Sequence, residues 1–334
     1  MKRFSIFFLI SIPFFCLSQN NNSDNVSDEL FLMFYNVENL FDTIDSPNNN
    51  DNEFLPSSKK KWNSYKYYYK LEQLDKVFKS LVENKNNNFL PDIIGLCEVE
   101  NRLVIEDLLA SPSFEGHNYT IIHKDSPDRR GIDCALLLSN KFQVLKKDFI
   151  IIDNPDVNNK TRDIVFVKLK FDSYVINIFV NHWPSRWGGQ EKSNHKRVFA
   201  SKVLSEYINI NTSLDEYTII MGDFNDYPSN ESITKLIDDE KFVNLMTRKF
   251  ISGKGSYNYK GKWNWLDQIL VSKNLISSNI NHISSGSFKR DFMLYKIKNG
   301  EGIPSRSFGG NNWYGGFSDH LPIYFKFNFI DNSY

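Results

Sequence analysis

The sequence predicts a layered α/β domain in which mixed β-sheets are covered by helices on the outside. Short runs rich in Ile, Val, Phe and Tyr recur along the chain, and most end at Asn, Gly, Asp or Ser, as strands do. Stretches with helical periodicity interrupt these runs. The runs 164–171 and 175–180 are joined by a turn so short that the two strands must be antiparallel, whereas other runs are separated by helices.

The expected elements alternate along the whole chain. The expected strands are Leu30–Tyr35, Ile93–Cys97, Tyr119–Ile122, Cys134–Leu138, Ile164–Phe171, Val175–Val180, Tyr217–Met221, Leu266–Val271 and Ile323–Phe327. The expected helices are Tyr65–Glu83, Arg102–Leu109, Lys192–Tyr207 and Glu231–Ile237. The sequence contains no internal repeat and no linker long enough to divide it, so we expect one domain.

The first 18 residues have the layout of a secretory signal peptide. Lys2 and Arg3 precede an apolar run over 4–17, which is shorter than the roughly 20 residues that a membrane span needs. Cys16-Leu17-Ser18 supplies a small-residue pattern for cleavage before Gln19. We therefore expect a secreted or periplasmic protein with a flexible segment over 19–29 and no transmembrane segment. A lipid anchor on Cys16 is the alternative, although Phe14 and Phe15 are bulky for such a site.

The net charge and the cysteines give two further indications about the mature chain. Removing Lys2 and Arg3 from 40 basic residues leaves 38 against 40 acidic ones, a net charge of −2, so no strongly basic polynucleotide-binding surface is evident in the total. Cys97 and Cys134 both lie in apolar runs, and we expect two buried thiols, although an export compartment would also permit a disulfide.

Polar residues that could take part in catalysis or binding cluster just beyond the ends of the expected strands. Taken singly, each has an ordinary explanation as a turn former or a surface charge. Six such clusters at strand ends favour a site, because a rigid sheet positions the loops there. The residues are Asn36, Glu38 and Asn39; Glu98 and Glu100; Asn181, His182 and Arg186; Asp223, Asn225 and Asp226; Asp267; and Ser318, Asp319 and His320.

In this order the clusters resemble the successive motifs of the endonuclease/exonuclease/phosphatase superfamily, which includes DNase I-like nucleases. The motifs are "FYNVENLFD", "IIGLCEVEN", "RRGIDCALL", "NHWPSRWGG", "MGDFNDYPS", "LDQILVS" and "FSDHLPI". The resemblance covers about residues 30–328. It implies a four-layered α/β sandwich, with two mixed β-sheets packed face to face and helices outside, and metal-dependent hydrolysis of phosphoesters.

The resemblance also implies a metal site. Glu98 matches the family's metal-binding Glu, and Asn36 would orient it. Glu38 and Asp319 are expected as further residues of the metal environment, Glu38 at a position that varies among members. Carboxylate oxygens suit Mg²⁺, with Mn²⁺ or Ca²⁺ as alternatives. The ion would neutralise phosphate charge and stabilise the leaving oxygen.

The catalytic residues follow from the same resemblance. Asp267 would hold His320 in one tautomer, and His320 would act as a base towards water or as a cation that binds phosphate. Asp223 would hold or deprotonate the attacking water, and Asn225 would donate to a phosphate oxygen. His182 would flank the phosphate. Asp226, directly after this group, is interpreted as a turn residue.

Several arginines are candidates for substrate binding, because a guanidinium can contact phosphate through two donors. Arg162 matches a family position near the phosphate, and Arg186 is a second candidate. Arg129 and Arg130 are equally well explained as exposed surface charges.

Two segments bear on the substrate without deciding it. The stretch 57–70 mixes cations with aromatic residues and could bind nucleic acid, but Tyr65, Tyr68, Tyr69 and Leu71 also fit one packed side of a helix, which we favour. The glycine-rich loop 308–316 could form a mobile wall of the site.

We therefore expect a monomeric, Mg²⁺-dependent phosphodiesterase that acts as a nuclease on a nucleic acid. One alternative is a phosphatase or a phospholipase C-like (sphingomyelinase-like) hydrolase of a small or lipid phosphoester. An inactive binding protein of the same fold is a further alternative, but this chain keeps the residues of every motif that such a protein would be expected to lose.

Overall fold

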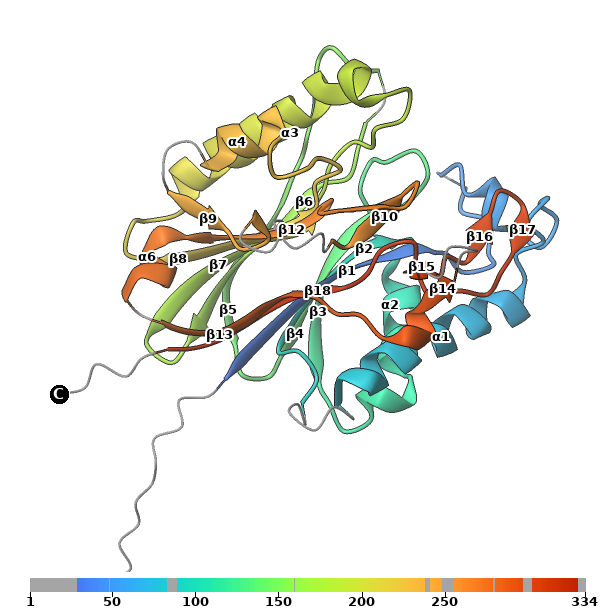
Figure 1. Ribbon diagram of the computed structural model, residues 1–334, viewed down its shortest axis with the longest axis horizontal. Coiled ribbons are helices and arrows are strands. Elements are labelled where there is room, and N and C mark those ends of the chain that lie inside the picture. Colours follow the sequence, from blue (N-terminus) through green and yellow to red (C-terminus); the bar gives the residue numbers. More distant parts are fainter. Residues whose placement is uncertain are drawn as a thin grey trace, which may run out of the picture.

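The structure, a computed structural model, describes residues 29–329 apart from 48, 83–88, 159, 238–240, 248–254, 279 and 297–301. The expected signal peptide, Cys16 and all but the last residue of the expected flexible segment lie outside the described residues. Two six-stranded sheets are stacked face to face, with helices on both outer faces (Figure 1). The four-layered α/β sandwich is confirmed.

The first sheet is built from both ends of the domain. Its strand order is β13 (Ile280–Ser287), β18 (Ile323–Phe329), β1 (Leu30–Leu40), β2 (Ile93–Val99), β4 (Asp133–Ser139) and β3 (Tyr119–His123). β1 and β2 are parallel, and the other neighbours are antiparallel, so the sheet is mixed.

The second sheet comes from the middle of the chain. Its strand order is β5 (Gln143–Ile150), β6 (Ile164–Phe171), β7 (Tyr174–His182), β8 (Tyr217–Asp223), β12 (Asp267–Ser272) and β9 (Phe242–Asn244). β7 and β8 are parallel, and the remaining pairs are antiparallel, including the expected β6–β7 hairpin.

Helices cover the two outer faces. α1 (Ser64–Val82) and α2 (Arg102–Leu109) lie on the first sheet, and α3 (Gln190–Asn211) and α4 (Glu231–Ile237) lie on the second (Figure 1). α6 (Lys273–Ser278) follows β12. The smaller elements are the 3₁₀ turns Asn52–Phe54, Pro112–Phe114 and Asp291–Met293, and the hairpins β10 (Tyr257–Tyr259) with β11 (Lys262–Asn264), β14 (Leu294–Lys296) with β15 (Gly302–Pro304), and β16 (Phe308–Gly309) with β17 (Asn312–Trp313).

Alternating side chains of the strands form the core in three layers. One face of each sheet points to the other sheet, where Phe34, Ile178 and Met221 are fully buried. The opposite faces pack against the helices on each side. Cys97 and Cys134 are buried free thiols, as expected, and burial raises the pKa of both, so they pack as small apolar residues.

Two sequence predictions differ from the structure. In the two large sheets, β5, β9 and β13 were not expected, because they are edge strands whose polar residues break the alternating pattern. The three short hairpins and α6 were not expected either. The expected packed side of α1 is wrong at Tyr65 and Tyr68, which are 69% and 57% exposed. The helix instead buries Tyr67 and Lys70 with Leu71. A lysine that the sequence pattern places on the solvated face therefore lies in the interior.

Candidate active site

A polar pocket of about 180 Å³ lies at one end of the two sheets, where residues from both sheets meet. Six of the residues expected to be catalytic or metal-binding line it directly, and they come from widely separated parts of the chain. The lining residues are Asn39, Glu98, Arg130, His182, Ser185, Asp223, Asn225, Tyr257, Leu266, Asp319 and His320.

The second sheet contributes three residues in one row. The strand register places His182 at the end of β7 opposite Asp223 at the end of β8, and Asp223 opposite Asp267 at the start of β12. Gly222 allows this row to form, because a Cβ at that position would lie 2.3 Å from the carbonyl oxygen of Asn181 on β7. The pairing of the strands therefore assembles the row without any contribution from loops.

The first sheet contributes Glu98 through an irregularity in β2. The register of β2 shifts between Cys97 and Val99, and Glu98 has a left-handed backbone with φ of 64°. Its carboxylate accepts from the Asn39 backbone N–H at 3.0 Å and from Asn36 Nδ2 at 3.3 Å. Asn36 Nδ2 also donates to Asp223 Oδ2 at 3.1 Å, so one carboxamide links the acids of the two sheets.

His320 and Asp267 form the expected pair. His320 Nδ1 lies 2.6 Å from Asp267 Oδ2, and Nε2 lies 3.8 Å from Asp223 Oδ2. The His320 backbone N–H donates to Ser318 Oγ, which donates to the Asn36 carbonyl oxygen, and the Tyr257 ring lies 4.9 Å from the imidazole. These contacts fix the orientation of the ring from three sides.

The pocket holds its two histidines in opposite charge states. Burial opposes a charge on His320, but the Asp267 and Asp223 carboxylates outweigh it and raise the pKa of His320 well above its usual value. Burial, with Arg162 and Arg130 nearby, lowers the pKa of His182 well below its usual value. At neutral pH the pocket therefore presents a cationic His320 and a neutral His182, which can serve different chemical roles.

We predict that Asp223→Asn changes the pH dependence of stability. Burial raises the pKa of Asp223 to about 6, from an unfolded value near 3.8. Between these values the folded state binds more protons than the unfolded state, so this residue costs stability progressively as the pH rises from 4 to 6. Relative to the wild type in EDTA, Asp223→Asn should gain stability over that window, by at most about 3 kcal/mol.

Urea unfolding at pH 4, 5 and 6 measures this difference. His320 is protonated in both states over this range and does not contribute. A variant whose free energy of unfolding stays parallel to that of the wild type from pH 4 to pH 6 would contradict the burial argument.

Two of the expected metal residues are in contact with Arg306. Glu38 does not line the pocket; its carboxylate accepts from the Ser307 backbone N–H at 2.6 Å and lies 3.6 Å from Arg306 Nε. Asp319 lines the pocket but is held by Arg306 at 2.6 Å. Lys70 is buried nearby and donates to Ser307 Oγ at 2.9 Å. Glu38 thus fastens the loop that leads to Asp319, and its expected role at the metal remains a prediction.

The expected substrate arginines lie outside this pocket. The Arg162 guanidinium is buried and donates to Asp128 at 3.1 Å and to the Trp183 carbonyl oxygen at 2.8 Å. Arg186 stacks on the Tyr227 ring at 3.8 Å and donates to the Asn225 carbonyl oxygen at 2.7 Å. Both hold the walls of the pocket in place, and direct phosphate contact by either remains a prediction.

Asn225 is held beside the pocket with one of its donors engaged. Its Nδ2 donates to the Trp183 carbonyl oxygen at 3.0 Å, and its backbone N–H donates to Asp223 Oδ1 at 2.8 Å. The carboxamide has a second N–H, which leaves one donor for a ligand.

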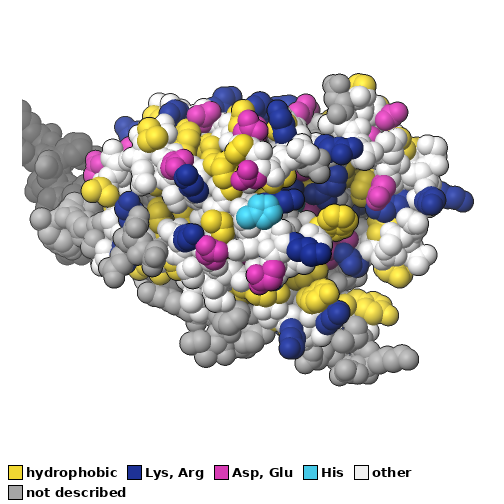
Figure 2. Space-filling model, turned by 90° about the horizontal axis from the view of Figure 1, so that it is seen from above, with side chains coloured by type: hydrophobic (Ala, Val, Ile, Leu, Met, Phe, Trp, Pro, Cys, Tyr) yellow, Lys and Arg dark blue, Asp and Glu magenta, His cyan; other side chains and the backbone are white. Residues whose placement is uncertain are grey.

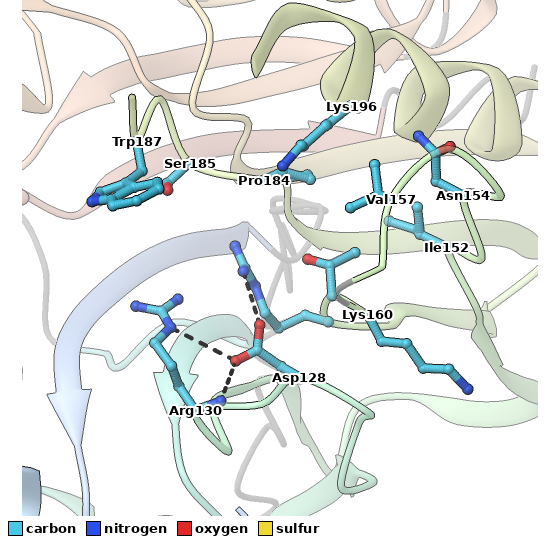
Figure 3. Close-up of a pocket in the computed structure, with 12 residues that line it drawn as sticks. Asp128, Arg130, Ile152, Asn154, Val157, Lys160, Pro184, Ser185, Trp187 and Lys196 are labelled. Carbon is cyan, nitrogen blue, oxygen red and sulfur yellow. Dashed lines mark hydrogen bonds and ion pairs between the residues drawn. The ribbon is translucent and has the colours of Figure 1, made fainter. Parts of the chain in front are cut away.

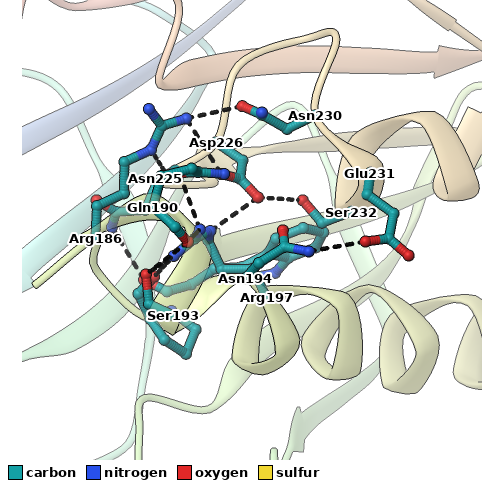
Figure 4. A network of polar contacts seen from close by, with 12 residues as sticks. Arg186, Gln190, Ser193, Asn194, Arg197, Asn225, Asp226, Asn230, Glu231 and Ser232 are labelled. Atoms are coloured by element: carbon teal, nitrogen blue, oxygen red, sulfur yellow. Dashed lines mark hydrogen bonds and ion pairs between the residues drawn. The ribbon is translucent and has the colours of Figure 1, made fainter. Parts of the chain in front are cut away.

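The interpretation of Asp226 as a turn residue is wrong. Asp226 is fully buried and forms an ion pair with Arg197 Nε at 2.8 Å on α3 (Figure 4). It also accepts from Gln190 at 2.9 Å, from Ser232 at 2.6 Å and from Arg186 at 3.2 Å. Asp226 therefore joins the pocket loop to α3 and α4, a role that its position after Asn225 did not indicate.

Some lining residues were missed in the sequence. Tyr257 comes from the β10–β11 hairpin, whose short strands give no sequence signal, and Leu266 was expected only as the first residue of a strand. Ser185 lies within a recognised motif but carries no charge to draw attention. Arg130 was a weaker candidate because "DRR" also reads as a surface turn, and it does line the pocket.

The residues of the pocket fit a bound divalent cation. Three carboxylates line it, from Glu98, Asp223 and Asp319, and such a group of acids favours a positive partner. Asp223, Asp267 and His320 also form a compact group of metal-ligating types, but Asp267 engages Nδ1 of His320. Glu98, with Asn36 behind it, is therefore the better position for an oxygen-preferring ion.

Comparison with known proteins identifies the family of this chain. Residues 31–328 match the model of the "Endonuclease/Exonuclease/phosphatase family", while none of the curated proteins searched matches the sequence. Among the residues that the structure describes, no helix is both long and apolar enough to cross a membrane.

Solved structures with low sequence identity share the fold. A humanized D. rerio TDP2 is 14% identical with a TM-score of 0.57, covering 90% of this chain and 99% of that one. A Bacteroides thetaiotaomicron protein of the same family is 14% identical with a TM-score of 0.57, covering 92% and 100%. A mannosyl-6-phosphatase from B. thetaiotaomicron is 16% identical with a TM-score of 0.57, covering 90% and 99%. This chain belongs to the endonuclease/exonuclease/phosphatase family of phosphoester hydrolases.

Proposed function

We propose that the protein is a Mg²⁺-dependent phosphodiesterase that cleaves nucleic acid by attack of water on phosphorus. The observation that carries this proposal is the arrangement of His320 between two carboxylates, with Nδ1 at 2.6 Å from Asp267 and Nε2 facing Asp223 at 3.8 Å. The buried cation can attract an anionic substrate, and the neighbouring carboxylate, whose pKa is raised, can accept a proton from the attacking water.

Each side chain has a separate task in this proposal. The cationic His320 attracts a non-bridging phosphate oxygen, and Asp267 keeps its ring charged and oriented. Asp223 holds the attacking water and accepts its proton, because its pKa of about 6 lies close to neutrality. Neutral His182 and the free N–H of Asn225 complete the donors around the phosphate.

Glu98 and Asn36 would hold the metal, with Asp319 as a further carboxylate on the same wall. When bound, Mg²⁺ supplies positive charge against the phosphate and the leaving oxygen. Mn²⁺ uses the same oxygen ligands and is expected to substitute for it, and Ca²⁺ is a third candidate.

We predict that Glu98→Gln raises the Mg²⁺ concentration needed for half-maximal rate by about tenfold or more, because a carboxamide lacks the charge that holds a hard cation. The measurement is initial rate against Mg²⁺ concentration for both proteins. Glu115→Gln, at an exposed position far from the pocket, is the matched control and should behave as wild type. Identical titrations for Glu98→Gln and wild type would remove Glu98 from the metal site.

The substrate class is tested by comparing plasmid DNA, RNA, sphingomyelin and a soluble phosphomonoester, each with Mg²⁺ and with EDTA. Metal-dependent cleavage of DNA or RNA supports the nuclease proposal. Activity confined to the lipid or the phosphomonoester would replace the substrate and keep the chemistry. No hydrolysis of any of the four would favour an untested phosphoester first, and an inactive binding protein of this fold after it.

The distribution of charged side chains on the surface is compatible with a nucleic-acid strand that binds to a local basic area. On the face shown in Figure 2, Lys and Arg side chains gather to the right of an exposed histidine, which is neither of the buried His182 and His320, whereas basic and acidic side chains are interspersed elsewhere. We also propose that the protein acts as a monomer in an export compartment. Mass spectrometry of the mature protein tests the export proposal, with cleavage before Gln19 expected and a lipid on Cys16 as the alternative.

A further inference from the structure

A second cavity of about 220 Å³ adjoins the catalytic pocket and plays no part in the chemistry described above. The two share Arg130 and Ser185 in their linings, so a ligand can extend from one to the other. The second cavity is formed by the loop before β4, the loop before β6, the segment after β7 and the side of α3.

The cavity carries an excess of positive charge. Four cationic side chains line it against a single acid, Asp128, which pairs with the buried Arg162 at 3.1 Å and more loosely with Arg130 at 3.7 Å. The cations are Arg130, Lys160, Arg162 and Lys196. In Figure 3 the Arg130 guanidinium and the Lys196 ammonium approach the open space from different walls, while the Lys160 ammonium turns away. An anionic group in this space would meet at least two cations.

One aromatic side chain stands at the mouth of the same cavity. Trp187 is 90% exposed, although it lines the cavity with its neighbour Ser185 (Figure 3). Gly188 and Gly189 follow it with left-handed φ values of 82° and 113°, and nothing lies within 4 Å of a Cβ at either position. A large apolar ring held in water on an open turn is available for stacking on a flat ligand group.

We propose that this cavity binds the phosphate next to the scissile one on a single nucleotide strand, with a base stacked on Trp187. The proposal rests on the proposed function, since it names the substrate of the same pocket. A cationic cavity alone would accept any second phosphate, for example in a small bisphosphate. The exposed indole favours a nucleotide, because its ring has no role in binding an isolated phosphate.

The test uses Lys196→Ala and Trp187→Ala, because neither residue lines the catalytic pocket. Lys192→Ala removes an equal charge from an exposed position one turn earlier on α3 and is the matched control. The substrates are a short single-stranded DNA and bis(4-nitrophenyl) phosphate, a diester with only one phosphate.

The expected result is a loss confined to the strand. Trp187→Ala and Lys196→Ala should each raise KM for the oligonucleotide by about fivefold or more and leave kcat/KM for the small diester unchanged. Lys196→Ala should also reduce the slope of log KM against log salt by about 0.7. Unchanged oligonucleotide kinetics, or an equal loss on both substrates, would overturn the proposal.

Two further measurements separate this proposal from the function on which it rests. Binding of the oligonucleotide in EDTA is followed by quenching of tryptophan fluorescence, which Trp187→Ala should abolish even if the wild type cleaves no DNA. Absence of binding would overturn the subsite. Competition by thymidine 3′,5′-bisphosphate should exceed that by fructose 1,6-bisphosphate; equal competition, insensitive to Trp187→Ala, would overturn the nucleotide assignment.

Discussion

His320→Ala is expected to lower kcat for phosphodiester hydrolysis by about 10²- to 10⁴-fold, the largest catalytic effect that the site predicts. The imidazole is a buried cation that faces Asp223, and its charge is maintained by Asp267 at 2.6 Å. Its loss removes both the contact to the phosphate and the positive charge next to the attacking water. Initial rates at saturating Mg²⁺, with folding checked by circular dichroism, measure the effect.

Two further variants show whether this loss is specific to His320 and its pairing with Asp267. His117→Ala removes an exposed histidine far from the pocket and should keep wild-type kcat. Asp267→Asn should lower kcat with little change in KM, because Asp267 does not line the pocket and acts through His320. Wild-type turnover in His320→Ala would end the proposed mechanism, and wild-type turnover in Asp267→Asn would end the role of the pair.

Asp226→Asn is expected to lower the free energy of unfolding by about 3 kcal/mol or more, the largest stability effect predicted here. Asp226 is fully buried and pairs with Arg197 at 2.8 Å, and Arg197 is itself fully buried. The substitution keeps the shape of the side chain but leaves the guanidinium charge without its partner, which is costly in a low-dielectric interior. Urea denaturation at pH 7 measures the difference.

Asp215→Asn, at an exposed position before β8, is the matched control, and its effect should stay within about 0.5 kcal/mol. The double variant Asp226→Asn with Arg197→Gln should cost less than the sum of the single variants, because neither charge then remains unpaired. A small effect of Asp226→Asn, equal to that of Asp215→Asn, would restore the simpler interpretation of Asp226 as a turn residue.

The sequence predicts those parts of the fold that are buried on a regular strand or helix. Runs such as 164–171 and 217–221 reveal their strands because apolar side chains are required on both faces. The three residues His182, Asp223 and Asp267 could also be singled out, since they stand at the ends of such runs and the order of the motifs resembled that of the family. What the sequence did not contain was the register that sets the three side by side.

Contacts between distant segments account for the remaining differences. Asp226 looks like a turn former because its partner Arg197 is on a different element, and Lys70 looks solvated because Ser307 and the Phe317 carbonyl oxygen approach it only in the fold. The sequence could not show whether Arg186 binds phosphate or other residues of the chain, because its partners, such as Asn225, are nearly 40 positions away. The local sequence pattern indicates which residues are buried and which could react, but it does not indicate which distant residue each of them contacts.

The most direct test of the account is cleavage of a DNA oligonucleotide by the wild-type protein in ¹⁸O-labelled water, with Mg²⁺ and with EDTA. We expect cleavage only with Mg²⁺, with one ¹⁸O atom in the phosphate of the product, because water held by Asp223 attacks phosphorus. Cleavage that persists in EDTA, or product phosphate without the label, would contradict metal-assisted hydrolysis at this pocket.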